Sequence, residues 1–101
     1  MPRIGIIVSF RLKPGSWEKF DAIIREHARR TREEEPGCER FEAFQPVTAE
    51  GALDKGRFMV CEVYRDQAAL DAHIKNPRLA VVRKNYADLV ESRELTICHL
   101  T

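Results

Sequence analysis

The part of the chain that most restricts its fold is residues 57–79, RFMVCEVYRDQAALDAHIKNPRL. Its first half predicts a strand, in which successive side chains point to opposite faces. One face would carry Phe58, Val60, Glu62 and Tyr64, and the other Met59, Cys61 and Val63. Both sets are largely apolar, so neither face suits contact with water, and the strand is expected to be covered on both sides.

Glu62 is the exception on this strand, because a carboxylate in apolar surroundings must be paired, protonated or used chemically. Asp66 predicts the N-cap of a short helix over residues 67–75. His73 falls on the same side of this helix as Leu70. We therefore expect a carboxylate and an imidazole that both face inward from neighbouring elements.

The rest of the chain alternates strand and helix patterns. Strands are expected at residues 4–12, 38–45, 57–64 and 94–100, and helices at 17–34, 67–75 and from Pro77 onward. The last helix is expected to continue its apolar stripe through Leu89 and Val90. Residues 46–56 are polar and turn-rich and predict a mobile surface loop. The order is typical of an α+β, ferredoxin-like (βαββαβ) fold, an antiparallel sheet with helices on one face, here as a single domain over residues 1–101.

Because no strand alternates cleanly between apolar and polar residues, the sheet face away from the helices should also be apolar. Such a face is stable when a second sheet covers it. We therefore expect a homodimer in which two sheets pack face to face, as a dimeric α/β barrel.

Charge and cysteine content restrict the partners and the compartment. The chain has 17 basic and 16 acidic residues and a net charge of +1, which offers no bulk attraction to nucleic acid or to an acidic membrane. The basic run near residue 30 is followed at once by Glu33, Glu34 and Glu35, which predicts a solvated helix face. Cys38, Cys61 and Cys98 lack CxxC spacing and are expected as thiols in a reducing compartment. With no signal-peptide pattern and no apolar run of about 20 residues, a cytoplasmic protein without membrane contact is expected.

Three titratable residues are candidates for chemistry. His73 would be a general base with Glu62 orienting it; the alternatives are a structural histidine and a strand ion pair. His27 lies on the apolar stripe of the first helix and is either a core histidine or a third member of the site. Two histidines and a carboxylate are also the ligands of a facial iron site, an alternative that metal analysis would test.

Aromatic side chains would line a pocket or form ordinary core: Trp17, Phe41, Phe58, Tyr64 and Tyr86. Tyr64 is the one that favours a site, because it shares the face of Glu62 and its hydroxyl needs a partner when buried. The sequence has no P-loop, GxGxxG fingerprint, nucleophile elbow or zinc cluster, so no nucleotide, flavin or metal cofactor is expected.

Three segments, KPGSWEKF, EEEPGCERFEAFQ and VYRDQAALDAHIKNPRL, resemble the antibiotic biosynthesis monooxygenase (ABM) family of small dimeric α/β-barrel proteins. The resemblance covers most of the chain and is greatest to quinol-monooxygenase-like and autoinducer-2-processing-like members. It implies a pocket between sheet and helices, and in some members oxidation of phenolic substrates by O₂ without a metal, flavin or haem.

The resemblance also implies roles for residues. The family's strand glutamate, the aromatic two residues later and the helix histidine correspond to Glu62, Tyr64 and His73. Phe41 and His27 correspond to further pocket positions. The chain departs from the pattern at Arg78, where relatives commonly have a second histidine, and an arginine at the pocket edge would favour an anionic substrate. The residues of the haem-degrading branch are not found.

Three functions follow from these candidates. The first is a cofactor-independent monooxygenase of a small electron-rich aromatic or quinol, with His73 and Glu62 as catalytic residues and Tyr64, His27, Phe41 and Arg78 binding the substrate. The second is an isomerase or tautomerase of a small anionic carbonyl compound, held by Arg78 or Lys75. The third is a non-catalytic, dimeric small-molecule-binding stress protein.

Overall fold

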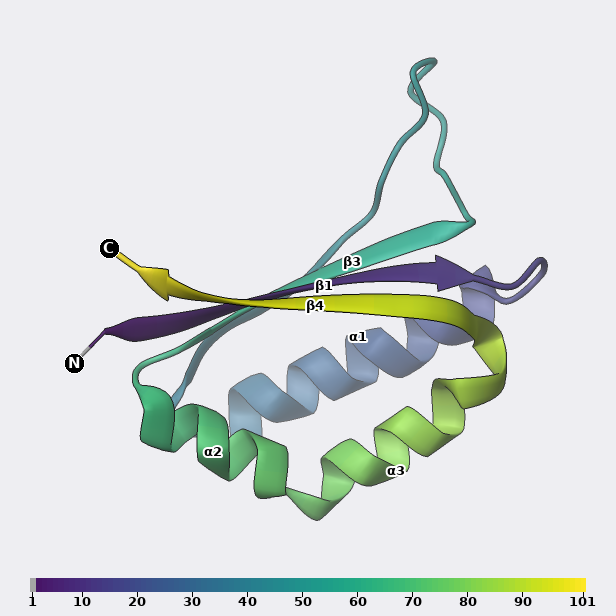
Figure 1. Cartoon of the computed structure of the whole chain (residues 1–101). Coiled ribbons are helices and arrows are strands. Elements are labelled where there is room, and N and C mark those ends of the chain that lie inside the picture. Colours follow the sequence, from purple (N-terminus) through teal and green to yellow (C-terminus); the bar gives the residue numbers. More distant parts are fainter. Residues whose placement is uncertain (1) are drawn as a thin grey trace.

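The computed structural model describes residues 2–101. In chain order these form β1 (Arg3–Leu12), α1 (Trp17–Glu34), β2 (Cys38–Phe44), β3 (Arg57–Tyr64), α2 (Gln67–Lys75), α3 (Pro77–Tyr86), a 3-10 turn η1 (Ala87–Leu89) and β4 (Val90–Leu100). The strands form one open sheet in the order β2-β3-β1-β4, with every neighbouring pair antiparallel. The helices lie on one side of this sheet (Figure 1). The predicted α+β, ferredoxin-like fold is confirmed.

The register of the sheet determines which side chains face the helices. Ile6 of β1 lies opposite Glu62 of β3 and Ile97 of β4, and Glu62 also lies opposite Phe41 of β2. Directly opposed residues share a face, so this row points toward the helices, as do the rows two residues away. The inward orientation predicted for Glu62 is therefore observed.

An aromatic cluster fixes α1 and α3 on the sheet. The rings of Phe10, Phe20, Phe58 and Tyr86 meet edge to face, with centroids 4.9 to 5.6 Å apart. All four side chains are buried. Aromatic pairs in this geometry contribute about 1 kcal/mol each beyond the burial of apolar area. Phe20 thus brings the first half of α1 into this cluster, whereas His27 and Thr31 are buried in its second half.

The break between α2 and α3 is made by one residue. The backbone N–H of Asn76 donates to the carbonyl of His73, which ends α2, and its side chain accepts from the N–H of Arg78, which begins α3. Pro77 occupies the first turn of α3, where a missing N–H costs nothing. The predicted break at these residues is confirmed.

Gly37 allows α2 to approach the turn that follows α1. A Cβ atom at this position would lie 2.3 Å from the Cβ of Ala69, and the N–H of Arg65 donates to the Gly37 carbonyl at 3.0 Å. The start of α2 therefore packs closely on the turn that follows α1.

The last helix is shorter than its apolar stripe predicts. It ends at Tyr86, Leu89 lies in the 3-10 turn and Val90 begins β4. The reason is local hydrogen bonding, because the Leu89 carbonyl accepts from the N–H of Lys13 and Val90 pairs with Leu12. Leu89 and Val90 are therefore still partly buried, but they do not belong to the helix.

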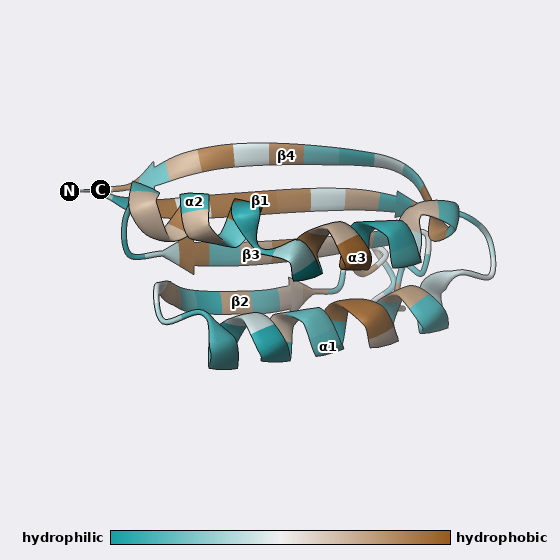
Figure 2. Ribbon diagram, turned by 90° about the horizontal axis from the view of Figure 1, so that it is seen from below, coloured by the Kyte–Doolittle hydropathy of each residue, from teal (hydrophilic) through white to brown (hydrophobic). Residues whose placement is uncertain are grey.

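Two surfaces of the sheet remain uncovered. The face opposite the helices exposes Ile7 (41%) and Phe44 (49%), and β4 lies beyond the reach of the helices (Figure 2), so Leu95 (43%) and Ile97 (57%) are exposed on the helix side. Residues 45–56 form an arm that extends away from the helices (Figure 1), closed by an antiparallel bridge between Val47 and Leu53. None of the described helices is long and apolar enough to cross a membrane.

Candidate functional site

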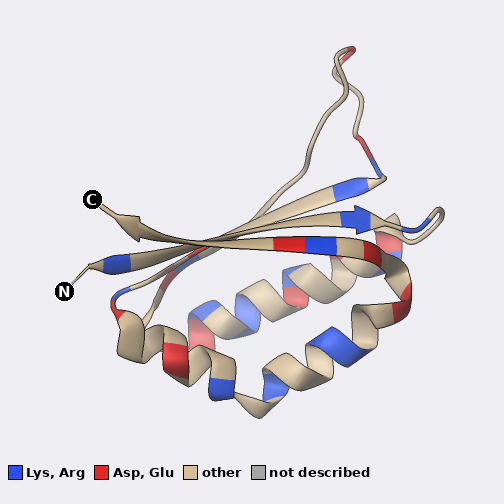
Figure 3. Ribbon diagram, in the orientation of Figure 1, with Lys and Arg blue, Asp and Glu red and all other residues tan. Residues whose placement is uncertain are grey.

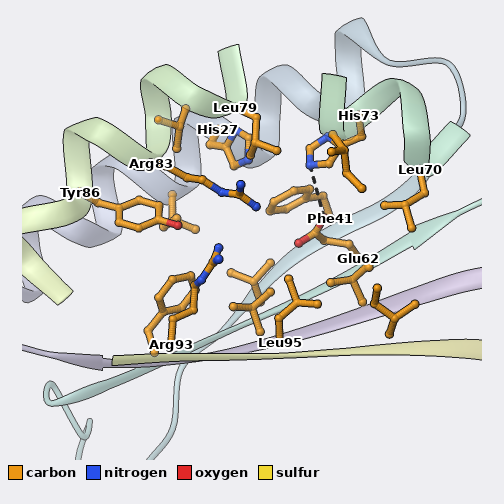
Figure 4. A pocket seen from close by; sticks show the side chains of 18 residues that line it. His27, Phe41, Glu62, Leu70, His73, Leu79, Arg83, Tyr86, Arg93 and Leu95 are labelled. Carbon is orange, nitrogen blue, oxygen red and sulfur yellow. Dashed lines mark ion pairs between the residues drawn. The ribbon is translucent and has the colours of Figure 1, made fainter. Parts of the chain in front are cut away.

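A cavity of about 130 Å³ lies between the sheet and the helices (Figure 4). An engineered apolar cavity of about 150 Å³ holds one benzene molecule, so this volume suits a single ring. Its wall is mostly apolar and carries a few polar groups, which is typical of a small-molecule site. The lining residues are Ile6, Val8, Phe10, Ile24, His27, Phe41, Val60, Glu62, Leu70, His73, Ile74, Leu79, Val82, Arg83, Tyr86, Arg93, Leu95 and Ile97. Four candidates from the sequence, His27, Phe41, Glu62 and His73, therefore meet at one cavity.

His73 presents one ring nitrogen to the cavity and gives the other to Glu35. Its Nδ1 lies 2.8 Å from Oε1 of Glu35, and its Nε2 lies 3.8 Å from Oε1 of Glu62. Glu35 also accepts hydrogen bonds from Arg78 and Asn76, so it is the acceptor toward His73 as well. In the neutral ring Nδ1 therefore carries the proton, and Nε2 is the acceptor that faces the cavity.

The sequence analysis assigned the orienting role to Glu62, whereas the structure gives Glu35 the shorter contact with His73. Glu35 follows α1 directly, and its side chain is 13% exposed. It belongs to the acidic run that was predicted to be solvated. The available signal was spacing, because Glu35 lies four residues after Thr31, which is on the buried stripe of α1.

Arg78 lies behind the histidines and not at the cavity edge where it was expected. Its Nη2 donates to Oε2 of Glu35 at 2.7 Å, and its Nη1 contacts Nδ1 of His27 at 2.8 Å. The side chain is only 9% exposed and is absent from the wall of the cavity. The capping contact with Asn76 places Arg78 in the first turn of α3, and from there it reaches the end of α1.

Arg78 also determines the tautomer of His27. A guanidinium can only donate hydrogen bonds, so Nδ1 of His27 accepts and Nε2 carries the proton. Burial, and then the nearby charge of Arg78, lowers the pKa of His27 from 6.5 to about 4. His27 is therefore a neutral imidazole near pH 7, and its remaining ring nitrogen is an N–H donor. The centroids of the two histidine rings are 5.9 Å apart.

Glu62 and Tyr64 form a buried pair on β3. The hydroxyl of Tyr64 donates to Oε1 of Glu62 at 2.6 Å, which supplies the partner that the sequence called for. Burial raises the pKa of Glu62 despite this hydrogen bond, and burial also raises the pKa of Tyr64. Tyr64 is fully buried behind Glu62 and does not line the cavity, contrary to its expected contact with a substrate. It acts instead on Glu62.

Two arginines that the sequence analysis did not single out also enter the cavity. Arg83 projects from α3 and Arg93 from β4 (Figure 4). Arg93 lies opposite Phe10, so it shares the inward parity of Leu95 and Ile97. The fourth strand predicted from the sequence began at residue 94, one residue after Arg93. The missed signal was that Arg93 continues the alternation that places Leu95 and Ile97 on the inward face.

Within residues 2–101, no three His, Cys, Asp or Glu side chains are grouped so that they could hold a metal ion. The facial arrangement considered for His27, His73 and Glu62 is therefore not formed. One reason is that Arg78 donates to Nδ1 of His27, so that Nε2 of His27 carries a proton and has no lone pair for a metal.

Comparison with known proteins is consistent with this architecture. The family model for antibiotic biosynthesis monooxygenase matches residues 3–85. A candidate antibiotic biosynthesis monooxygenase from Caulobacter crescentus superimposes with a TM-score of 0.89 at 17% identity, covering 99% of this chain and 91% of the other. A similar protein from Nitrosomonas europaea gives 0.83 at 26% identity, over 97% and 89%.

A conserved protein of unknown function from Bacteroides thetaiotaomicron, described as a possible oxidoreductase, gives a TM-score of 0.85 at 22% identity over 98% of both chains. No functionally curated protein matches this sequence.

Proposed function

The chain belongs to the antibiotic biosynthesis monooxygenase family, and from this premise we propose that it oxidises a small electron-rich phenol or quinol with O₂, without a cofactor. The observation that carries the proposal is the pair of imidazoles with opposite hydrogen-bonding roles at one apolar cavity. His73 offers a lone pair on Nε2, and His27 offers an N–H. Both are held from behind by the ion pair of Glu35 with Arg78, at 2.7 Å.

In the proposed reaction, Nε2 of His73 removes the phenolic proton, and the N–H of His27 stabilises the phenolate oxygen. The electron-rich phenolate transfers one electron to O₂, and the two radicals combine to form a ring hydroperoxide, protonated by His73. His73 then removes the proton from the same ring carbon as the O–O bond breaks and returns it to the departing hydroxide. The products are a quinone and water, so the substrate supplies all the electrons.

Glu62 would assist His73 in these proton transfers. Burial raises the pKa of Glu62, and its Oε1 lies 3.8 Å from Nε2 of His73, close enough to interact with the imidazolium when it forms. Phe41, whose ring meets His27 edge to face at 5.1 Å, would pack against the substrate ring.

The test is oxygen uptake by dialysed, metal-free protein with a panel of phenols and quinols. The His73→Ala variant should lose on the order of a hundredfold in turnover, because general base catalysis contributes that much. The matched control is His99→Ala, since His99 is an exposed histidine on β4. Near-normal turnover of His73→Ala on a verified substrate would remove His73 from the mechanism.

The same two imidazoles would also suit an isomerase or tautomerase, because a base and a neutral N–H donor are what enolisation requires. Oxygen uptake separates the two functions, since proton shuttling consumes no O₂. Tight binding of one compound with no turnover in either assay would point to a binding protein instead.

We further propose that two chains pack through their open sheet faces. The support is the exposed apolar surface of Ile7 and Phe44 and the arm, which extends away from the helices (Figure 1) and exposes Val47 (59%) and Leu53 (51%). Sedimentation should give a dimer at micromolar concentration, and Ile7→Lys should give monomers. A stable wild-type monomer would contradict this assembly.

The described cysteines are free thiols, which fits the expected cytoplasmic setting.

A further inference from the structure

The cavity has a second group of polar side chains besides the histidines and Glu62. Arg83 and Arg93 enter it from two different elements, on the side opposite His73 and Glu62 (Figure 4). The rest of the wall is mostly apolar, with Val8, Leu79 and Leu95 among its members. The cavity therefore has a cationic side opposite His73 and Glu62 (Figure 4).

Neither Arg83 nor Arg93 has a hydrogen bond or an ion pair to any group in residues 2–101. This contrasts with other arginines of the chain. Arg25, Arg29, Arg30 and Arg40, which are exposed as Arg83 and Arg93 are, each bind a carboxylate. Two guanidinium groups at one cavity without a protein carboxylate leave their N–H donors available to an external anion.

The charge of Arg83 acts on the catalytic end of the cavity. It is one of the charges that lower the pKa of His27, and it opposes the upward shift in the pKa of Glu62.

We propose that Arg83 and Arg93 form an anion-binding subsite, so that the substrate is an acidic aromatic compound: one ring that carries a carboxylate or phosphate group as well as the reacting hydroxyl. Guanidinium groups bind both anions through paired, charge-assisted hydrogen bonds. The aromatic ring of the substrate would pack on the apolar wall of the cavity, and the anchored anion would direct its hydroxyl toward His27 and His73. This inference rests on the proposed function for the hydroxyl, whereas the anion subsite itself is testable without turnover.

The experiment measures binding calorimetrically in the absence of O₂. The probes are 2,5-dihydroxybenzoate, its uncharged amide and 4-hydroxyphenyl phosphate. The variants are Arg83→Gln, Arg93→Gln and the double variant. Lys84→Gln is the control, because it removes the same charge from the next residue of α3, which does not line the cavity. The thermal unfolding of each variant confirms that it is folded.

We expect each single variant to weaken binding of the carboxylate on the order of tenfold and the double variant more, with little change for the amide or for Lys84→Gln. The ratio of phosphate to carboxylate affinity in the wild type identifies which anion the subsite prefers. Equal binding of benzoate and amide, or equal losses for both probes in the variants, would overturn the proposal.

Oxygen uptake is then measured separately with the same probes. Anion-dependent binding without O₂ uptake would keep the subsite and refute the oxidation. Uptake that is equal for acid and amide, with binding unaffected by either arginine, would keep the oxidation and refute the subsite.

Discussion

The two faces of α1 carry the same kinds of charged residue and use them differently. On the outer face, Arg29 pairs with Glu33 and Arg30 with Glu34, both in contact with water (Figure 3). One residue further on, Glu35 is turned inward and holds Arg78 and His73. Exposed pairs contribute a few tenths of a kcal/mol, whereas a buried pair is costly to break. Adjacent glutamates therefore differ in effect because of their surroundings, and this difference can be measured.

The largest effect is expected from removal of the buried carboxylate. Glu35→Ala leaves the guanidinium of Arg78 buried without its main partner, and should lower the free energy of unfolding by about 3 kcal/mol. Glu33→Ala, on the outer face, should cost about 0.5 kcal/mol or less. Urea titration of both variants makes the comparison, and similar losses would show that the two faces are equivalent.

A second effect concerns pH. Because the pKa of His27 is lowered from 6.5 to about 4, the unfolded chain binds more protons than the folded chain in this interval. Stability from His27 is thus complete above pH 6.5 and is lost as the pH falls toward 4, by about 3 kcal/mol. His27→Asn, which keeps an acceptor for Arg78, should remove this part of the acid sensitivity. His99→Asn, at an exposed histidine, should leave the pH profile of urea denaturation as in the wild type.

A smaller effect is expected when the charge is kept and the shape of the cation is changed. Arg78→Lys retains one positive charge but cannot reach Glu35 and His27 together, so it should cost about 1.5 kcal/mol. It should also allow His27 to populate both neutral tautomers, a change that ¹⁵N NMR of the imidazole nitrogens would detect. On the outer face, Arg30→Lys should change stability by no more than about 0.3 kcal/mol. Unchanged imidazole spectra for Arg78→Lys would mean that Arg78 does not control His27.

Local patterns were sufficient to predict the elements and the inward residues. The bounds of α2, the break at Asn76 and the inward position of Glu62 follow from capping and from the two-residue period of a strand, which act over a few residues. For the same reason the meeting of His27, Phe41, Glu62 and His73 could be anticipated from faces alone.

The supports behind the histidines could not be predicted in this way. The contact of Glu35 with Arg78 joins residues 43 positions apart, and depends on how closely α2 and α3 approach the end of α1. That approach depends on a small residue at Gly37, which carries no pattern of its own. Among the three glutamates at residues 33–35, spacing from the buried stripe of α1 marks the third as inward-facing, but the sequence does not show which groups it meets there.

Asn76 has a consequence for redesign of this site. His73 lies three residues before it and Arg78 two residues after it, and both bind the carboxylate of Glu35. The number of residues between α2 and α3 is therefore fixed by this site. One inserted residue would rotate α3 by about 100° and carry Arg78 away from Glu35. The size of the cavity is therefore best changed along β4, where Leu95 and Ile97 can be replaced by smaller or larger residues without moving either imidazole.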